Sequence, residues 1–437
     1  MVSSDASRPR VAIIGAGWSG LACALTLARA GIAPTVFEAA PEPGGRARRA
    51  FLHAHWRDNG QHLLLRGCSA VHSMLQLIGV QLPRTPFAYV DGHRTLTVRR
   101  GNLFALIRAL VQATGFSWSE RFAMLRALLG LQCRTWKVPA DQTVAQWLQS
   151  SRQPTSLVEH FWEPLALAVM NTPMASASMQ RFASVLRDTL GQGGSALELL
   201  QPASDLSEAI VLPLVKSIEA ANGRILCGTR VAALMALPTG DYRIRTDNND
   251  LDQSFTHVVS TVPPWAFDHM DLPFDTGSLA QRFGAQPITT VYLGFDPDTR
   301  LTAPLVQLAG PTPSDARVWA MDRAHCGEPG TIAISLSAEG AWTTLDPDTL
   351  ATRCIANLAQ SAGLNAPCQW HKVVGIRRAT PASTPNATMH AAEQEPLPGL
   401  FLAGDWTHPS YPATLEAAVQ TGMNVANQIL QRVRMCS

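Results

Sequence analysis

The sequence predicts an α/β protein that combines a Rossmann-type parallel sheet, assembled from separate segments of the chain, with an α+β domain. Two observations carry this prediction: a strand, glycine turn and helix close to the N-terminus, and a second strand that ends in an acidic residue close to the C-terminus. Long insertions between them supply the other domain. Of the 437 residues, 46% are hydrophobic and 16% are charged, which excludes a disordered or fibrous chain.

The first element is a buried strand at residues 11–14, which runs into the glycine turn GAGWSG. Gly15 permits the tight turn, Gly17 lets the backbone approach a pyrophosphate, and Gly20 allows close packing of the helix on the strand. The helix start offers amide groups to that pyrophosphate. Glu38 ends the next apolar run, where an acid binds ribose hydroxyls. The unit therefore predicts a dinucleotide, either FAD or NAD(P).

The second element is the segment PGGRAR at residues 43–48. Gly45 would let the backbone lie against a cofactor, and Arg46 would supply a fixed cation for phosphate oxygens. A solvated basic turn is the alternative. The segment resembles the second fingerprint of the flavoproteins of the amine oxidase and phytoene desaturase superfamily, and this resemblance favours FAD.

The C-terminal element is a strand at residues 400–403 that enters a turn at Gly404 and Asp405 and continues into a long helix. An acid at the carboxyl edge of such a strand lies where doubly wound folds bind ligands. The resemblance implies that Asp405 bonds the ribityl chain of FAD and that the backbone at Leu415 faces the flavin ring. A helix start there would stabilise a reduced, anionic flavin. Where the superfamily usually has Glu-Gly-Ala, this chain has Glu-Ala-Ala at 416–418.

Two further segments complete the expected domains. Val231 ends the segment GRILCGTRV, whose counterpart in the superfamily holds adenine through its backbone, and residues 257–265 form an apolar strand stopped by two prolines. We therefore assign residues 1–90, 205–270 and 390–437 to an FAD-binding domain. Residues 91–204 and 271–389 form the substrate-binding domain, which gives the two-domain architecture of amine-oxidase-like flavoproteins.

Four motifs support a closer resemblance. They are DNGQHLLL at 58–65, FWEPL at 161–165 with NTP at 171–173, RAT at 378–380, and the stretch from Ala403 to Thr414. Together they resemble the hydroxysqualene dehydroxylase family, also described as squalene-associated FAD-dependent desaturases. The resemblance implies an FAD-dependent reductive dehydroxylation of hydroxysqualene to squalene in squalene and hopanoid biosynthesis.

That chemistry directs attention to proton donors, because hydroxide leaves poorly without a proton. His62 is the first candidate for the catalytic acid, since the pKa of histidine lies near neutrality, and Asp58 could orient it or act itself. The competing reading is that Asp58 and His62 brace a turn. Glu163 and Asn171 are second candidates in an apolar stretch, where a buried polar group needs a partner; for Glu163 the structural reading is favoured.

The inferred substrate is a bilayer lipid, so helices are expected at 102–114 and 117–131 whose basic and leucine-rich faces could dock on a membrane surface. No apolar run is long enough to span a bilayer. The expected localisation is cytoplasmic, peripheral on the inner face of the cytoplasmic membrane, with contact to squalene-pathway synthases. A net charge of +2 gives no reason to expect nucleic acid as a partner, and the cysteine spacing predicts no metal site.

Three alternatives remain. A carotenoid-type desaturase acting on phytoene-like polyenes would run the redox chemistry in the opposite direction with the same fold and FAD. An amine oxidase would need a lysine near the flavin, for which Lys372 is the one plausible residue. A non-catalytic flavin-binding scaffold would tolerate changes at His62 or Asp58 but not the loss of Gly15.

Overall fold

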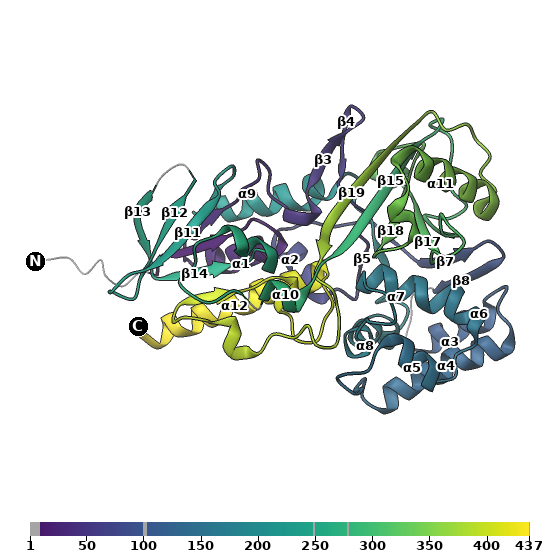
Figure 1. Ribbon diagram of the computed structural model, residues 1–437, viewed down its shortest axis with the longest axis horizontal. Coiled ribbons are helices and arrows are strands. Elements are labelled where there is room, and N and C mark those ends of the chain that lie inside the picture. The colour runs from purple at the N-terminus through teal and green to yellow at the C-terminus, as the bar shows by residue number, and fades with distance from the viewer. Residues whose placement is uncertain (1–8, 99–102, 248–249, 278, 437) are drawn as a thin grey trace, which may run out of the picture.

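The computed structural model describes residues 9–98, 103–247, 250–277 and 279–436. Figure 1 shows an elongated molecule with a parallel sheet and its helices at one end. The other end holds a large antiparallel sheet and a group of helices. The C-terminal helix, α12 (Leu415–Cys436), lies at the end that carries the parallel sheet.

The parallel sheet draws its strands from the whole length of the chain. Its order is β10-β2-β1-β14-β20, and the bounds are β10 (Arg224–Leu226), β2 (Thr35–Phe37), β1 (Val11–Ile14), β14 (His257–Ser260) and β20 (Leu400–Leu402). Every neighbouring pair is parallel. All five strands fall within the three segments that the sequence assigns to the FAD-binding domain.

Alternation along β1 builds a different layer on each face of this sheet. Val11 and Ile13 pack with α1 (Trp18–Arg29), α9 (Leu212–Ala220) and α12 (Leu415–Cys436). Ala12 and Ile14 face a three-stranded antiparallel sheet of β11 (Val231–Ala236), β12 (Tyr242–Thr246) and β13 (Asp250–Phe255). The carboxyl end of β1 therefore opens between these layers, at the glycine turn.

The other half of the molecule contains an antiparallel sheet with the strand order β16-β17-β18-β15-β19. Its strands are β15 (Gln286–Gly294), β16 (Leu305–Leu308), β17 (Val318–Asp322), β18 (Thr331–Ser337) and β19 (Trp370–Thr380). One face packs against α11 (Pro347–Ala362). Toward its other face lies α7 (Glu163–Met170), whose Pro164 carbonyl accepts a 3.2 Å hydrogen bond from the indole of Trp319 on β17.

The remaining elements connect these layers. The helices are α2 (Ser69–Leu77), α3 (Leu103–Gln112), α4 (Trp118–Cys133), α5 (Val144–Ser150), α6 (Thr155–Leu157), α8 (Met179–Asp188) and α10 (Leu279–Phe283), with π-helical turns at Val158–Trp162 and Ser207–Val211. The short strands are β3 (Arg49–Leu52), β4 (His55–Asp58), β5 (Leu64–Leu65), β6 (Arg84–Thr85), β7 (Phe87–Asp91), β8 (Arg94–Val98) and β9 (Leu199–Leu200).

Two of the expected domain boundaries differ from the structure. The boundary between residues 90 and 91 falls inside the antiparallel hairpin β7–β8, which folds as one unit, so the division belongs before β7. Strand β9, which the sequence division gave to the substrate-binding domain, pairs with β5 and β6 of the first segment. The other boundaries stay predictions.

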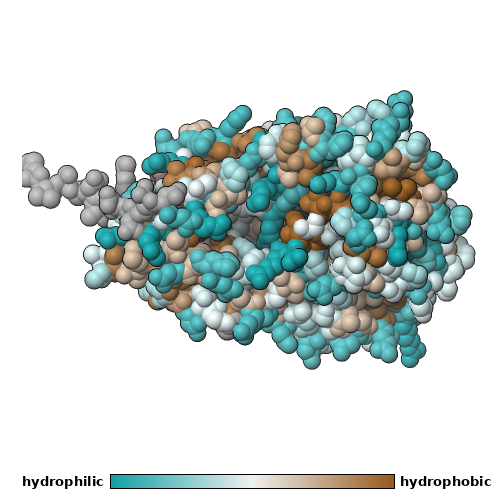
Figure 2. Space-filling view, turned by 45° about the horizontal axis from the view of Figure 1, so that its top comes forward, coloured by the Kyte–Doolittle hydropathy of each residue, from teal (hydrophilic) through white to brown (hydrophobic). Residues whose placement is uncertain are grey.

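On the surface, hydrophobic residues gather near the middle of the face in Figure 2 and are bordered by hydrophilic ones. Large exposed apolar side chains among the described residues include Phe51 and Trp56 of the β3–β4 hairpin and Trp118 and Phe122 of α4. None of the helices in the described ranges combines the length and hydrophobicity that crossing a bilayer requires.

Candidate functional site

The glycine turn leaves no space for side chains where a phosphate group would approach. Gly15 has a φ of +102°, and a Cβ at Gly20 would lie 1.9 Å from the Gly15 carbonyl oxygen. The backbone of Gly45 closes over the turn, because a Cβ there would lie 2.9 Å from the Cα of Gly17. Two sequence motifs, GAGWSG and PGGRAR, thus meet in one place, and their bare backbone fits a dinucleotide.

The acid that the sequence assigns to the ribose lies beside this turn. Glu38 accepts hydrogen bonds from the amides of Ala16 at 2.7 Å and Ala40 at 2.8 Å. Backbone hydrogen bonds join Glu38 to Leu226 and Thr229, at the end of β10. Val231, the predicted adenine contact, begins β11 nearby and is buried. The first motif, Glu38 and the segment before Val231 therefore meet at one edge of the sheet.

Arg46 and Asp405, which are 359 residues apart, form an ion pair of 2.6 Å. Arg46 also donates to the carbonyl of Ala379 at 2.9 Å, and its side chain keeps 35% of its exposure. Asp405 is buried and follows Gly404, whose φ of +132° turns the chain after β20. The predicted phosphate cation and the predicted ribityl acid are thus adjacent.

The start of α12 is held at this edge by side chains on both sides of it. Thr414 accepts a hydrogen bond from the amide of Ala417 at 3.2 Å and so caps the helix. Glu416 is buried and accepts from the amides of Ala70 at 2.8 Å and Val71 at 3.0 Å, which are the first turn of α2. These contacts fix the position of the helix start that carries Leu415. Ala417 stands where the superfamily usually has glycine, and its methyl group does not remove the cap formed by Thr414.

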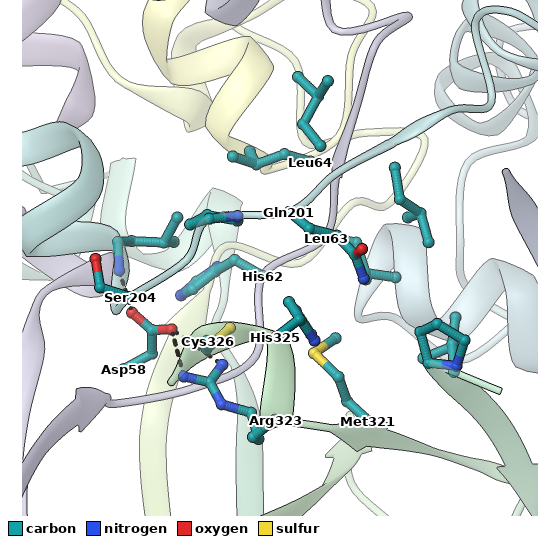
Figure 3. Close-up of a pocket in the computed structure, with 16 residues that line it drawn as sticks. Asp58, His62, Leu63, Leu64, Gln201, Ser204, Met321, Arg323, His325 and Cys326 are labelled. Carbon is teal, nitrogen blue, oxygen red and sulfur yellow. Dashed lines mark hydrogen bonds and ion pairs between the residues drawn. The ribbon is translucent and has the colours of Figure 1, made fainter. Parts of the chain in front are cut away.

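A buried cluster of charges anchors the DNGQH segment to the antiparallel sheet. Arg323, at the end of β17, donates to Asp58 at 3.1 Å and to Glu328 at 2.6 Å, and Arg57 pairs with Glu328 at 2.7 Å. The four side chains are 3–8% exposed. Asp58 also accepts from the amide of Leu206 at 2.8 Å. Figure 3 shows the contacts from Asp58 to Arg323 at the base of a pocket.

The same cluster orients the next residues of the segment. Arg323 donates to the Gln61 amide oxygen at 3.1 Å, so the Gln61 nitrogen faces Tyr292 of β15 and donates to its hydroxyl at 2.9 Å. That hydroxyl in turn donates to the carbonyl of Asp58 at 2.5 Å. All five N–H groups of Arg323 point at protein acceptors. Arg323 thus acts on the segment and not on a ligand.

His62 lines the pocket in Figure 3 together with Leu63, Leu64 and Met321. Burial lowers the pKa of His62 to about 4, and the charges of Arg323 and Arg46 act in the same direction. The imidazole is therefore neutral near pH 7. Burial raises the pKa of Asp58 while Arg323 opposes that shift. The contacts of Asp58 thus agree with the alternative stated above, in which Asp58 stabilises a turn. The catalytic roles of Asp58 and His62 stay predictions.

The second-rank candidates have separate surroundings. Asn171 is buried, has a φ of +44° at the end of α7, and bonds Thr380 at 2.8 Å and the amide of Ala338 at 2.7 Å. It ties three elements together. Glu163 lines a second cavity between α7 and β17, and burial followed by the charge of Glu159 raises its pKa.

Residues that the alternative reactions would use lie in different surroundings. Lys372 is exposed on β19, and the buried indole of Trp406 packs against Phe267 and Phe283. Sequence reasoning missed Arg323 and Tyr292, because nothing around either residue marks it and both act on a segment more than 230 residues away. A weak signal existed for Asn171, since asparagine commonly ends a helix in the left-handed region.

Comparison with known proteins gives a family for this geometry. The family model described as flavin containing amine oxidoreductase matches residues 18–430. Among curated proteins, the chain is 28% identical to a hydroxysqualene dehydroxylase of Rhodopseudomonas palustris, covering 96% of this chain and 98% of that protein. It is 27% identical to a hydroxysqualene dehydroxylase of Sinorhizobium fredii with the same coverage.

More distant similarities extend to other flavoproteins. The 15-cis-phytoene desaturase of Narcissus pseudonarcissus is 23% identical over 96% of this chain and 79% of its own length. Among solved structures, putrescine oxidase bound to putrescine superposes with a TM-score of 0.72 at 15% identity, covering 97% of this chain and 99% of that one. Reduced UDP-galactopyranose mutase gives a TM-score of 0.67 at 17% identity, covering 97% and 94%. These structures share the fold.

Proposed function

The chain belongs to the flavin-containing amine oxidoreductase family and is an FAD-dependent oxidoreductase related to squalene metabolism, and on this premise we propose that it converts hydroxysqualene to squalene. The observation that carries the proposal is the match, over nearly the full length of both proteins, to two hydroxysqualene dehydroxylases. Phytoene desaturases match at lower identity and only over about four fifths of their length. The alternative is the opposite redox direction on a phytoene-like polyene.

The reaction breaks the carbon–oxygen bond of the alcohol, adds a hydride to that carbon, and releases the hydroxyl as water after it gains a proton. Reduced FAD, when bound, supplies the hydride. The residues fit such a cofactor: the glycine turn and Glu38 at its nucleotide end, Arg46 at its phosphates, and Asp405 and the start of α12 at its ribityl chain and flavin.

The pocket around His62 suits an intermediate that water would destroy. Its walls combine polar side chains such as Asp58, Gln201 and Arg323 with seven leucine and methionine side chains, namely those of Leu63, Leu64, Leu199, Leu200, Leu206, Leu305 and Met321. The apolar part of these walls would limit the access of water to an allylic cation, while reduced FAD, when bound, would supply the hydride. A neutral His62 would donate or accept a hydrogen bond at the departing oxygen without adding a positive charge beside a cation.

The proposal is tested by reducing the purified holoprotein anaerobically and adding hydroxysqualene. The expected result is stoichiometric reoxidation of the flavin, followed by absorbance, with squalene in the lipid extract. Squalene itself serves as the control ligand and should leave the flavin reduced. A flavin that stays reduced with hydroxysqualene contradicts the proposal.

The desaturase alternative is tested with the same protein in the other oxidation state. Oxidised holoprotein is mixed with phytoene in the absence of oxygen. Bleaching of the flavin absorbance together with a longer conjugated polyene would favour the desaturase, whereas an unchanged spectrum is expected here. The scaffold alternative requires that neither experiment changes the flavin.

We also propose that α4 docks on an anionic lipid surface, where the substrate and the synthases that supply it would be met. Trp118, Phe122 and Leu129 are 61%, 68% and 40% exposed and lie within about 40° of one another around the helix. Arg121 stacks 4.6 Å from the centre of the Trp118 ring. Arg126 and Arg134 are exposed on the same helix and just after it. Basic and aromatic side chains together are typical of interfacial helices.

Sedimentation with vesicles tests this surface. The wild type should bind vesicles that contain anionic lipid more than neutral ones, and the variant Trp118→Ser with Phe122→Ser should lose most of that binding. The matched control is Phe51→Ser with Trp56→Ser, which removes the exposed aromatic pair of the β3–β4 hairpin. Loss in the hairpin variant and not in the α4 variant would place the docking surface elsewhere.

A further inference from the structure

We propose that Thr290 and His62 together form the seat that binds the hydroxyl group of the substrate, an inference that rests on the dehydroxylase function proposed above. Nothing in the sequence marks Thr290, which lies in the middle of β15 and is 1% exposed. A seat of this kind would select an alcohol over a hydrocarbon of the same length.

The first observation is a pair of polar atoms without partners. Within the described residues, the hydroxyl oxygen of Thr290 and the Nε2 atom of His62 are buried and form no hydrogen bond with the protein. Buried polar atoms in folded proteins nearly always have partners, so each exception calls for an explanation. A ligand that carries a polar group would supply the partner.

The second observation is that the two atoms lie around one point. A Cβ placed on Gly60 would be 3.9 Å from the His62 Nε2 atom and 4.0 Å from the Thr290 hydroxyl oxygen. The alternation of β15 agrees, because Thr290 and Tyr292 share a face and the Tyr292 hydroxyl contacts Asp58 and Gln61 on the same segment. The two unpartnered atoms therefore lie on the same side of Gly60, within 4.0 Å of one point.

The chemistry of the pair matches an alcohol. A threonine hydroxyl donates one hydrogen bond and accepts others, and a neutral imidazole nitrogen does one or the other according to its tautomer. Arg323, the strong cation of this region, has all five N–H groups bound to protein and holds the DNGQH segment in position. The seat thus offers neutral partners for a neutral group, as a tertiary or secondary alcohol requires.

The seat also lies between two cavities on one face of the antiparallel sheet. His62, Met321 and Arg323 line the first cavity. Ser335, the residue directly across from Thr290 in the strand register, and Trp319 line the second. Because Trp319 and Met321 are two residues apart on β17, the cavities share that face. The seat thus lies on the sheet face that lines both cavities.

The experiment measures binding and not turnover. Hydroxysqualene and squalene are titrated separately into oxidised holoprotein, and the change in flavin absorbance gives a Kd for each. The variant Thr290→Val replaces the hydroxyl with a methyl group of similar shape. We expect it to bind hydroxysqualene about tenfold more weakly, the value of one hydrogen bond, with an unchanged Kd for squalene. Thr290→Ser should restore the preference.

Two companion variants keep the result interpretable. Thr289→Val alters the neighbouring hydroxyl, which lies on the opposite face of β15, and should change neither Kd. His62→Gln tests the other half of the seat and should also weaken hydroxysqualene selectively, so the test does not depend on the folding of one variant.

Three outcomes would overturn the inference. An unchanged Kd for hydroxysqualene in both Thr290→Val and His62→Gln is the first, and an equal weakening of both ligands is the second. The third is a shifted flavin spectrum in ligand-free Thr290→Val, which would mean that the hydroxyl faces the cofactor. If wild-type protein turns hydroxysqualene over in any of these cases, the proposed function stands and only the seat fails; if it does not, the proposed function fails.

Discussion

Replacing Arg323 with methionine should remove the centre of the buried charge cluster while keeping a side chain of similar length. The change deletes five hydrogen-bond donors that serve Asp58, Gln61 and Glu328. It leaves Asp58 without its cation, because Arg57 pairs with Glu328. Removing one partner of a buried ion pair costs about 3–5 kcal/mol, since a charge stays behind without compensation.

Urea denaturation of the FAD-loaded protein, followed by tryptophan fluorescence, measures this loss. The matched control is Arg187→Met, because Arg187 pairs with Asp188 but is 46% exposed, and a surface pair contributes about 1 kcal/mol or less. A second test combines Arg323→Met with Asp58→Asn. The double variant should recover more than about 1 kcal/mol, because it removes the uncompensated carboxylate.

The pH dependence has a defined sign. Without Arg323, the pKa of Asp58 in the folded protein rises further above its unfolded value, so the folded state binds the extra proton as pH falls. The destabilisation should be largest at pH 7 and should shrink as pH falls through the raised pKa. A loss below about 1 kcal/mol in Arg323→Met, equal to that of the exposed control, would refute the view that this cluster couples the DNGQH segment to the sheet.

Three other perturbations have expected outcomes. The pKa of His62 near 4 lies below its unfolded value of 6.5, so the free energy of unfolding should fall by up to about 3 kcal/mol as pH drops from 6.5 to 4. In His62→Gln, the denaturation midpoint should depend less on pH over this range. An equally steep pH dependence in the variant would contradict the low pKa. Gly20→Ala should yield protein with little flavin absorbance, because the new Cβ would lie 1.9 Å from a carbonyl oxygen, while Gly130→Ala on α4, where the Cβ meets open space, should retain it. Glu416→Ala should lower the free energy of unfolding in urea by about 1–3 kcal/mol and weaken FAD binding, because it leaves two amides of α2 without an acceptor. Glu416→Gln keeps one oxygen and should recover part of the loss. Equal losses in the two variants would argue against the cap.

Features that depend on neighbours in the sequence could be predicted. The glycine turn, its strand and the helix after it occupy residues 11–29, and each is indicated by the residue types within its own segment. The same holds for the strand and turn at residues 400–405 and for the two helices expected at 102–131, which appear as α3 and α4. Whether those helices meet a membrane depends on a partner that the chain does not contain.

Features that depend on distant residues could not be predicted. Asp58 was singled out for its motif, but the residue that determines its environment, Arg323, lies 265 positions away. The low pKa of His62 likewise comes from burial and from the charge of Arg323. The usual pKa of histidine, near neutrality, therefore gave the wrong expectation for the charge of His62. The hairpin β7–β8 was divided in error because its turn, at Gly92, carried no change in composition.

The order of strands in the parallel sheet has a consequence for how the protein is made. Strand β1 pairs with β14, where Val11 lies opposite His257, and β14 pairs with β20 at Leu400. The central strands therefore lack these partners until much later residues have been synthesised. At a synthesis rate of about 5–20 residues per second, β1 leaves the ribosome on the order of ten seconds or more before β14. An unpaired strand edge invites association with other chains during that interval. Because Arg46 and Asp405 meet only after β20 has joined the sheet, FAD binding should be among the last steps of folding, and nascent chains should depend on chaperones until that point.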